Sequence, residues 1–148
     1  NNKRMTVLLV VVIFTIAAGC VPGSDSGSGR SVKFQQYFVE GQSLYEQHCS
    51  NCHQSDGGGL GRVYPPLNQA DYLEQNFPYL ACLIKQGKKG EIWVNGVMYN
   101  QEMKGIPTLT NLEVAEILTY ITNAWGNSGE LVEVSEVDNL LLTCTEPK

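Results

Sequence analysis

The sequence has little positive charge, no internal repeat and no long apolar run. It contains 10 Lys and Arg against 15 Asp and Glu among 148 residues, a formal net charge of −5. Nucleic-acid-binding proteins favour a basic face, so this balance argues against that class. The length suits one small domain plus a targeting segment.

The apolar run over 7–18 is too short to span a bilayer comfortably. It follows Lys3 and Arg4, and small residues lead from it to Cys20. This order is typical of a signal peptide, which we expect to occupy residues 1–19.

The residues just before Cys20 resemble a bacterial lipobox, so we expect Cys20 to be lipidated and to become the new N-terminus. Such a protein is exported and held at a membrane, in the periplasm or at the cell surface. Ordinary cleavage and an uncleaved anchor remain open as alternatives, and both also export the domain. Residues 22–31 are rich in Gly and Ser, so we expect residues 20–32 to form a flexible tether, with a disordered leader that has no role as the alternative.

Metal ligands are scarce as well, with 2 His and 3 Met in the chain. Cys49 and Cys52 are three residues apart and His53 follows directly, a spacing typical of c-type haem attachment. Residues i and i+3 lie on one helical face, so both sulfurs can reach one edge of a porphyrin. A zinc site would need two more ligands at suitable spacing, and no second pair is present. A thioredoxin-type redox pair would need a βαβ pattern, which is not visible.

The sequence resembles class I cytochrome c from about residue 41 to residue 126. The resemblance rests on four segments, namely 49–53, 64–67, 99–103 and 118–126. It implies the all-α cytochrome c fold, a few helices wrapped around one covalently bound haem c, with a small hairpin. In that family the carbonyl of Pro65 would accept a hydrogen bond from the ring of the iron ligand His53 and fix its tautomer. A rigid turn alone is the alternative for Pro65.

The sixth iron ligand is expected to be Met103. The family pattern places the ligating Met after Tyr99 and Asn100, and Met103 lies in a stretch without helix or strand pattern. Met98 lies inside a hairpin strand, where we expect it to fill the core. The departure from the family is Lys104, where Pro often follows the Met. Iron that lacks the Met would instead bind gas or peroxide.

Local patterns predict the helices and the hairpin. An apolar stripe predicts a first helix from Phe34 to His48, in which Gly41 allows a close crossing with the last helix. The other expected elements are one turn over 71–75, a helix between Pro78 and Gly87, an Asn95-Gly96 hairpin, a helix from the capping box Thr110–Glu113 to Gly126, and a short helix capped by Ser135 or Asp138.

These patterns divide the chain after the tether into a haem domain over 33–126 and a C-terminal extension over 127–148. Cys82 and Cys144 remain in an oxidising compartment, so we expect them to form a disulfide that pins the extension to the domain. Two unpaired thiols are the alternative.

Iron with His and Met ligands has no position open for a small-molecule substrate. The expected function is therefore single-electron transfer between redox partner proteins, without catalysis. The alternative is a haem subunit of a periplasmic oxidoreductase complex, such as a dehydrogenase, a nitrite reductase or a terminal oxidase. Four lysines at positions 85, 88, 89 and 104 would either steer an acidic partner or form an ordinary solvated face.

Overall fold

The computed structural model describes residues 29–144. The expected signal peptide, Cys20 and most of the expected tether lie outside these residues. Within 29–144, no helix is both long enough and apolar enough to cross a membrane.

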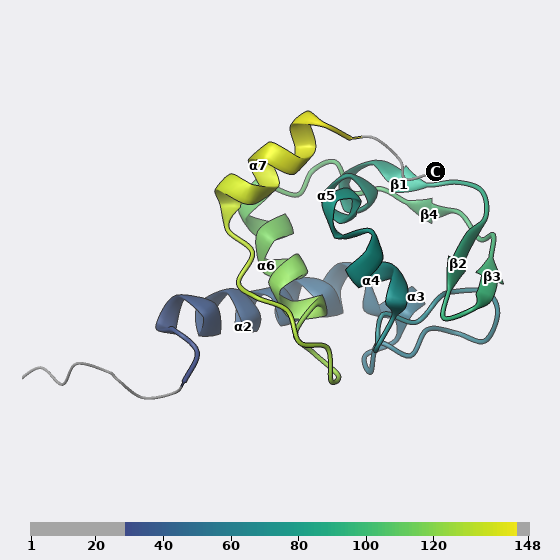
Figure 1. Ribbon diagram of the computed structural model, residues 1–148, viewed down its shortest axis with the longest axis horizontal. Coiled ribbons are helices and arrows are strands. Elements are labelled where there is room, and N and C mark those ends of the chain that lie inside the picture. The colour runs from purple at the N-terminus through teal and green to yellow at the C-terminus, as the bar shows by residue number, and fades with distance from the viewer. Residues whose placement is uncertain (1–28, 145–148) are drawn as a thin grey trace, which may run out of the picture.

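Helices dominate the described chain (Figure 1). They are α2 (Val32–His48), α3 (Ser50–His53), α4 (Asp71–Gln75), α5 (Phe77–Gln86), α6 (Asn111–Ile121) and α7 (Val134–Leu142). The strands are β1 (Gly87–Lys88), β2 (Ile92–Val94), β3 (Val97–Tyr99) and β4 (Met103–Lys104), paired as two antiparallel sheets, β1 with β4 and β2 with β3. The expected all-α class with a small hairpin is confirmed.

The first and last helices of the expected haem domain cross closely, as predicted. A Cβ atom at Gly41 of α2 would lie 2.6 Å from the carbonyl carbon of Glu116 and 2.9 Å from the Cβ of Tyr120, both on α6. Any side chain at this position would therefore push the helices apart. The Ser31 side chain accepts a hydrogen bond from Phe34 N and caps α2, so this helix begins slightly before its expected start at Phe34.

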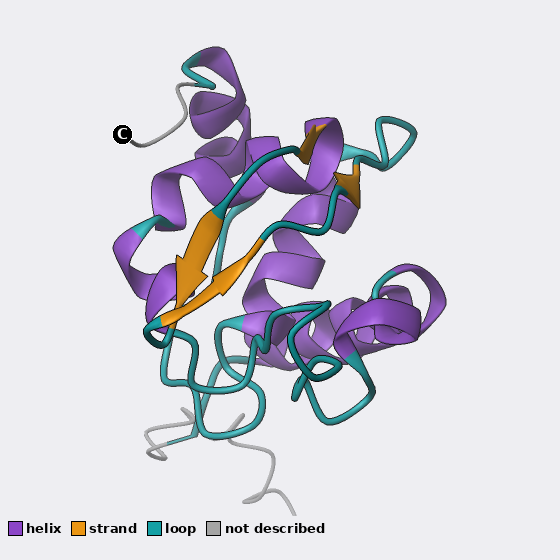
Figure 2. Cartoon of the chain, turned by 90° about the vertical axis from the view of Figure 1, so that its right-hand side faces the viewer, coloured by secondary structure: helices purple, strands orange, loops and turns teal. Residues whose placement is uncertain are grey.

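The hairpin is confirmed and lies on the side of the molecule that faces the viewer in Figure 2. Asn95 and Gly96 have φ of 51° and 74°, which a tight two-residue turn requires. This turn is tied to the start of α4. Asn95 N donates to Asp71 Oδ1 at 2.7 Å, and Asp71 N donates to Asn95 Oδ1 at 3.0 Å.

The helix expected to run to Gly126 ends earlier, at Ile121, although its capping box at Thr110 and Glu113 is confirmed. Thr122 Oγ1 donates to the Leu118 carbonyl at 2.7 Å, and this local bond competes with continued helix. Trp125 then adopts φ of 54°, so the chain turns away before Gly126.

The C-terminal extension forms α7, which packs against α5 and α6. Val137 is fully buried there, and a disulfide joins Cys144, just beyond α7, to Cys82 of α5. Ser135 and Asp138 do not cap this helix, so that prediction was wrong. The N-cap is Glu133, whose side chain makes no capping bond, and Asp138 instead accepts from Asn111 Nδ2 at 2.6 Å.

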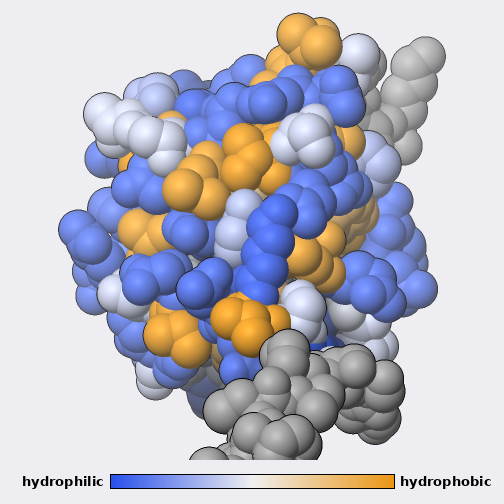
Figure 3. Space-filling view, turned by 90° about the vertical axis from the view of Figure 1, so that its left-hand side faces the viewer, coloured by the Kyte–Doolittle hydropathy of each residue, from blue (hydrophilic) through white to orange (hydrophobic). Residues whose placement is uncertain are grey.

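The surface on the side of α2 and α7 is mostly hydrophilic, with separate apolar spots (Figure 3). The exposed apolar residues of these two helices are Val32, Val39 and Leu142. The described core lies inside, where α6 contributes most of the fully buried side chains, namely Val114, Ile117, Leu118 and Thr119.

Candidate haem site

The three residues of the attachment motif lie on a single helical turn. Helix α3 directly follows α2, and Cys49 is the residue between them. Cys49 and Cys52 are partly exposed free thiols, whereas His53 is buried at 8% exposure. Burial raises the pKa of the Cys49 thiol to about 12, so this sulfur is uncharged. The turn thus presents two sulfurs beside a buried imidazole.

The ring of His53 has a defined tautomer. Its Nδ1 lies 2.9 Å from the carbonyl oxygen of Pro65, so Nδ1 carries the proton and donates it. Burial lowers the pKa of His53, although the bond to Pro65 acts in the opposite direction. A neutral ring that donates from Nδ1 leaves the Nε2 lone pair free to bind a metal.

The residues that follow His53 form a loop over 54–69, which we name the histidine loop. Two aromatic side chains hold its start. The Tyr45 hydroxyl of α2 donates to the Gln54 carbonyl, and Trp125 Nε1 donates to the Ser55 carbonyl at 3.2 Å. Gln54 has φ of 63°, which is unusual for a residue with a side chain. The two bonds keep this turn in place behind His53.

The same aromatic residues pack on one another. The Tyr45 and Trp125 rings are 5.1 Å apart, and each lies within 5.4 Å of the Tyr120 ring of α6. Burial raises the pKa of Tyr45. The histidine loop is therefore attached directly to the crossing of α2 and α6.

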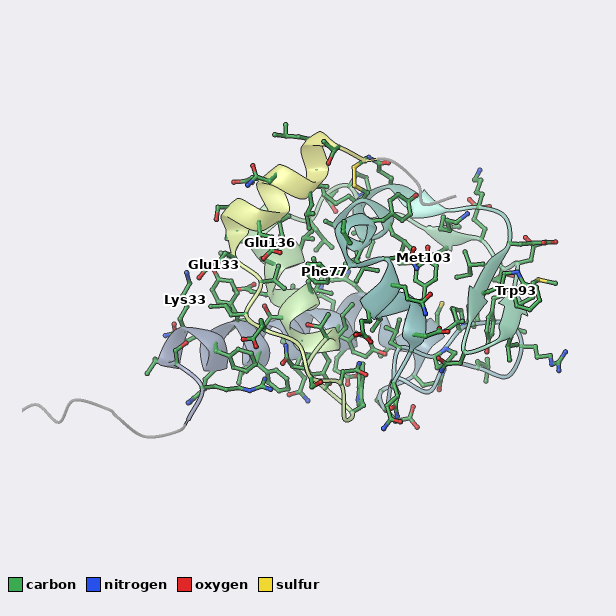
Figure 4. All side chains as sticks on the ribbon, in the orientation of Figure 1. Lys33, Phe77, Trp93, Met103, Glu133 and Glu136 are labelled. Atoms are coloured by element: carbon green, nitrogen blue, oxygen red, sulfur yellow. A yellow bond between two sulfur atoms is a disulfide. The ribbon has the colours of Figure 1, made fainter. Side chains whose placement is uncertain are left out.

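Met103, the expected sixth ligand, lies in β4, where it pairs with Lys88 of β1. The prediction that this stretch lacks strand structure was wrong. Met103 is partly buried, and Figure 4 places it between β4 and the region of α3 and α4. Met98 is 42% exposed and pairs with the exposed Trp93, so its predicted role as core filler was also wrong.

Gly87 of β1 and Gly105, which directly follows β4, allow the two backbones to approach closely. A Cβ atom at Gly105 would lie 2.5 Å from Gly87 N and 2.6 Å from the Lys85 carbonyl oxygen. The chain continues as what we name the methionine segment, residues 103–109. Ile106 N donates to the Ile84 carbonyl at 2.9 Å, and Lys85 Nζ donates to the Leu109 carbonyl at 2.7 Å. The segment is thus held rigidly without a Pro at position 104.

Comparison with known proteins decides the family. The family model described as Cytochrome c matches residues 38–125, which is more than half of the chain. The chain belongs to the cytochrome c family. As a cytochrome c it carries covalently bound haem c with iron and is an electron carrier, not an enzyme. The two free thiols on one turn and the free Nε2 of His53 fit that group.

Several curated relatives support this assignment. Cytochrome c-552 of Thermus thermophilus is 36% identical over 94 residues, which are 61% of this chain and 71% of the relative. The cytochrome c subunit of alcohol dehydrogenase (quinone) from Gluconacetobacter polyoxogenes is 29% identical over 93 residues, 60% of this chain. This cytochrome spans only 19% of that subunit's length.

The four lysines do not form one free positive patch in this cytochrome. Lys85 is partly buried and committed to the Leu109 carbonyl. Lys89 lies 3.4 Å from Glu102 in an exposed ion pair, which reduces its net charge toward a partner. This arrangement favours an ordinary solvated face over a steering patch.

Sequence reasoning did not identify Asn127, whose side chain ties the histidine loop to the end of α6. Its Oδ1 accepts from Gln69 N at 2.8 Å, and its Nδ2 donates to the carbonyls of Leu67 at 3.0 Å and Ile121 at 2.7 Å. A polar residue after a helix carries no signal for such a role.

Proposed function

We propose that this chain is a membrane-tethered monohaem cytochrome that is exported and carries single electrons between redox partner proteins. In this proposal Cys49 and Cys52 form the two thioether links, and His53 and Met103 are the axial ligands of the iron. The observation that supports it best is the buried His53 ring, which lies on the same helical turn as both thiols and whose Nδ1 donates to the Pro65 carbonyl.

The haem supplies the one-electron chemistry, and the protein determines how the haem is held. The bond from His53 to Pro65 orients the imidazole and makes it a better electron donor to the metal. The thioether of Met103 would be the second protein ligand of the iron, and such a ligand favours the reduced iron and raises the reduction potential. With both axial positions filled, the protein transfers electrons without binding a substrate at the iron.

The direct test uses the purified holoprotein. We expect a redox titration to fit a single one-electron step, and we expect the reduced protein not to bind carbon monoxide. Two steps, or rapid binding of carbon monoxide, would contradict a monohaem protein with both axial positions filled.

The tether is proposed from Cys20, which lies outside the described residues. A lipid at Cys20 would place the native protein in the detergent phase of a two-phase extraction, and Cys20→Ser would move it to the aqueous phase. Mass spectrometry of the native protein provides the decisive control. A mature N-terminus at another residue, without lipid, would contradict the tether while leaving the haem assignment intact.

A second candidate is a permanent electron-transfer subunit of a periplasmic oxidoreductase. It is supported by the similarity to the cytochrome c subunit of alcohol dehydrogenase (quinone). Purification of the native protein under mild conditions separates the two. A free carrier elutes alone, whereas a subunit elutes with a partner in fixed stoichiometry.

A further inference from the structure

Gly59 of the histidine loop lies against the carbonyl group that receives the His53 hydrogen bond. A Cβ atom at Gly59 would be 2.7 Å from both the carbonyl carbon and the carbonyl oxygen of Pro65, and it would be closer still to the Tyr64 oxygen. Real Cβ atoms essentially never approach other atoms within 3.0 Å. The Pro65 carbonyl can therefore occupy its present position only because residue 59 has no side chain.

The backbone of Gly59 also contacts His53 directly. Gly59 N donates to the His53 carbonyl at 2.9 Å. Gly59 thus bonds to the main chain of His53 and also leaves room for the Pro65 carbonyl oxygen, which fixes the orientation of the His53 ring. The φ of Gly59 is +70°, in the left-handed region that favours glycine.

We propose that Gly59 is a positioning residue for the axial histidine and that, through the bond from His53 to Pro65, it sets the reduction potential. This inference rests on the proposed role of His53 as an iron ligand. A side chain at position 59 would displace the Pro65 carbonyl and weaken its bond to Nδ1. The imidazole would then be a weaker donor, the oxidised iron would lose stabilisation, and the potential would rise.

The same loop provides a matched control in Gly61. Its φ is +55°, also in the left-handed region, but a Cβ atom there would meet nothing within 4 Å. Gly59→Ala and Gly61→Ala therefore impose similar backbone strain, and only the first disturbs the Pro65 carbonyl.

The experiment compares the two holoprotein variants with the unsubstituted protein by redox titration and by NMR exchange of the His53 ring proton in the reduced state. For Gly59→Ala we expect a higher potential and ring-proton exchange that is roughly ten-fold faster, as for one lost hydrogen bond. For Gly61→Ala we expect neither change. Equal shifts in both variants would assign the effect to backbone strain and overturn the proposal, as would the absence of any shift in Gly59→Ala.

A measurement without substitution applies if Gly59→Ala yields no holoprotein. The Gly59 amide proton and the His53 ring proton should exchange through the same local opening and should therefore respond equally to denaturant. A Gly59 amide whose exchange responds to denaturant differently from that of the ring proton would overturn the proposal. Failure of the axial assignment itself would be seen separately, because a variant lacking His53 would then leave the haem spectrum unchanged.

Discussion

The histidine loop and the methionine segment are held in different ways. The histidine loop is anchored by side chains from distant elements, with Tyr45, Trp125 and Asn127 all bonding to its backbone carbonyls. The methionine segment is anchored mainly by backbone contacts, through the pairing of β1 with β4 and the close approach of Gly87 and Gly105. One ligand therefore depends on the crossing of α2 and α6, and the other on a short sheet at the end of α5.

This difference indicates how each ligand would be lost. The histidine side is attached to the packed rings of Tyr45, Tyr120 and Trp125 at the crossing of α2 and α6, and it should loosen only when these helices separate. The methionine side depends on the short sheet of β1 and β4, which has only two residue pairs, so its opening should cost less free energy. Conditions that destabilise the protein mildly should release the methionine before the histidine.

The largest expected effect comes from removing the two proposed thioether links between the protein and the haem. Cys49→Ser combined with Cys52→Ser should leave a protein without covalent haem that folds poorly, because the porphyrin supplies much of the core. Acid–acetone extraction of the denatured protein measures this. The double variant Cys82→Ser and Cys144→Ser is the control, since it also removes two sulfurs but should keep its haem. Haem that resists extraction in the first variant would contradict the attachment assignment.

The disulfide tests whether the methionine side depends on α5. It joins positions 62 residues apart, and its removal should lower the free energy of unfolding of the holoprotein by about 4 kcal/mol. Because α5 leads directly into β1, the sulfur-to-iron charge-transfer band should disappear at lower denaturant than global unfolding in the variant. Unchanged stability under non-reducing conditions would show that α7 contributes little to the domain.

Gly105→Ala tests the methionine side alone. The added methyl group would overlap the backbone at Lys85 and Gly87, which should cost about 1–3 kcal/mol and weaken the charge-transfer band. Gly90→Ala is a control for general destabilisation, because its φ of +84° imposes backbone strain while the nearest atom to a Cβ would be 4.0 Å away, so it should leave the band intact. If Gly105→Ala left the charge-transfer band intact but changed the exchange of the His53 ring proton, position 105 would support the histidine and not the methionine, contrary to this comparison.

The smallest effect is expected at the capping box of α6, which contacts neither ligand. Thr110→Ala should lower the free energy of unfolding by about 1 kcal/mol and leave the haem spectrum unchanged. Hydrogen bonds from the backbone and the side chain of Thr110 lower the pKa of Glu113. The contribution of the side-chain bond is therefore present above the ordinary pKa of the carboxyl and is lost as the pH falls through the lowered value, whereas the backbone bond remains in Thr110→Ala. A pH series on both proteins checks this, and a difference that grows toward low pH would be contrary to it.

The sequence patterns predicted the elements whose causes are local. The spacing of Cys49, Cys52 and His53, the Asn95-Gly96 turn and the capping box at Thr110 each depend on a few neighbouring residues. The close crossing at Gly41 was also predicted, because a glycine within an apolar helical stripe requires a packing reason. The hydrogen bond between His53 and Pro65 was expected from the family resemblance.

The features that sequence did not predict depend on distant contacts. The end of α6 at Ile121 follows from Thr122 and from the turn at Trp125, whose ring is held by the histidine loop. The strand at Met103 exists only because Gly87 and Gly105 meet across residues distant in sequence. Met98 is exposed because it pairs with Trp93 on the outer face of the hairpin. The alternation of side chains along a strand does not by itself say which of the two faces is buried.

The most direct test of the proposed ligand pair compares Met103→Ala with Met98→Ala in the purified holoprotein. Met103→Ala should abolish the sulfur-to-iron charge-transfer band of the oxidised protein, lower its potential and allow it to bind carbon monoxide when reduced. Met98→Ala should leave all three nearly unchanged, because Met98 is 42% exposed on the hairpin. The reverse pattern would move the ligand to Met98, and no change in either variant would contradict methionine ligation altogether.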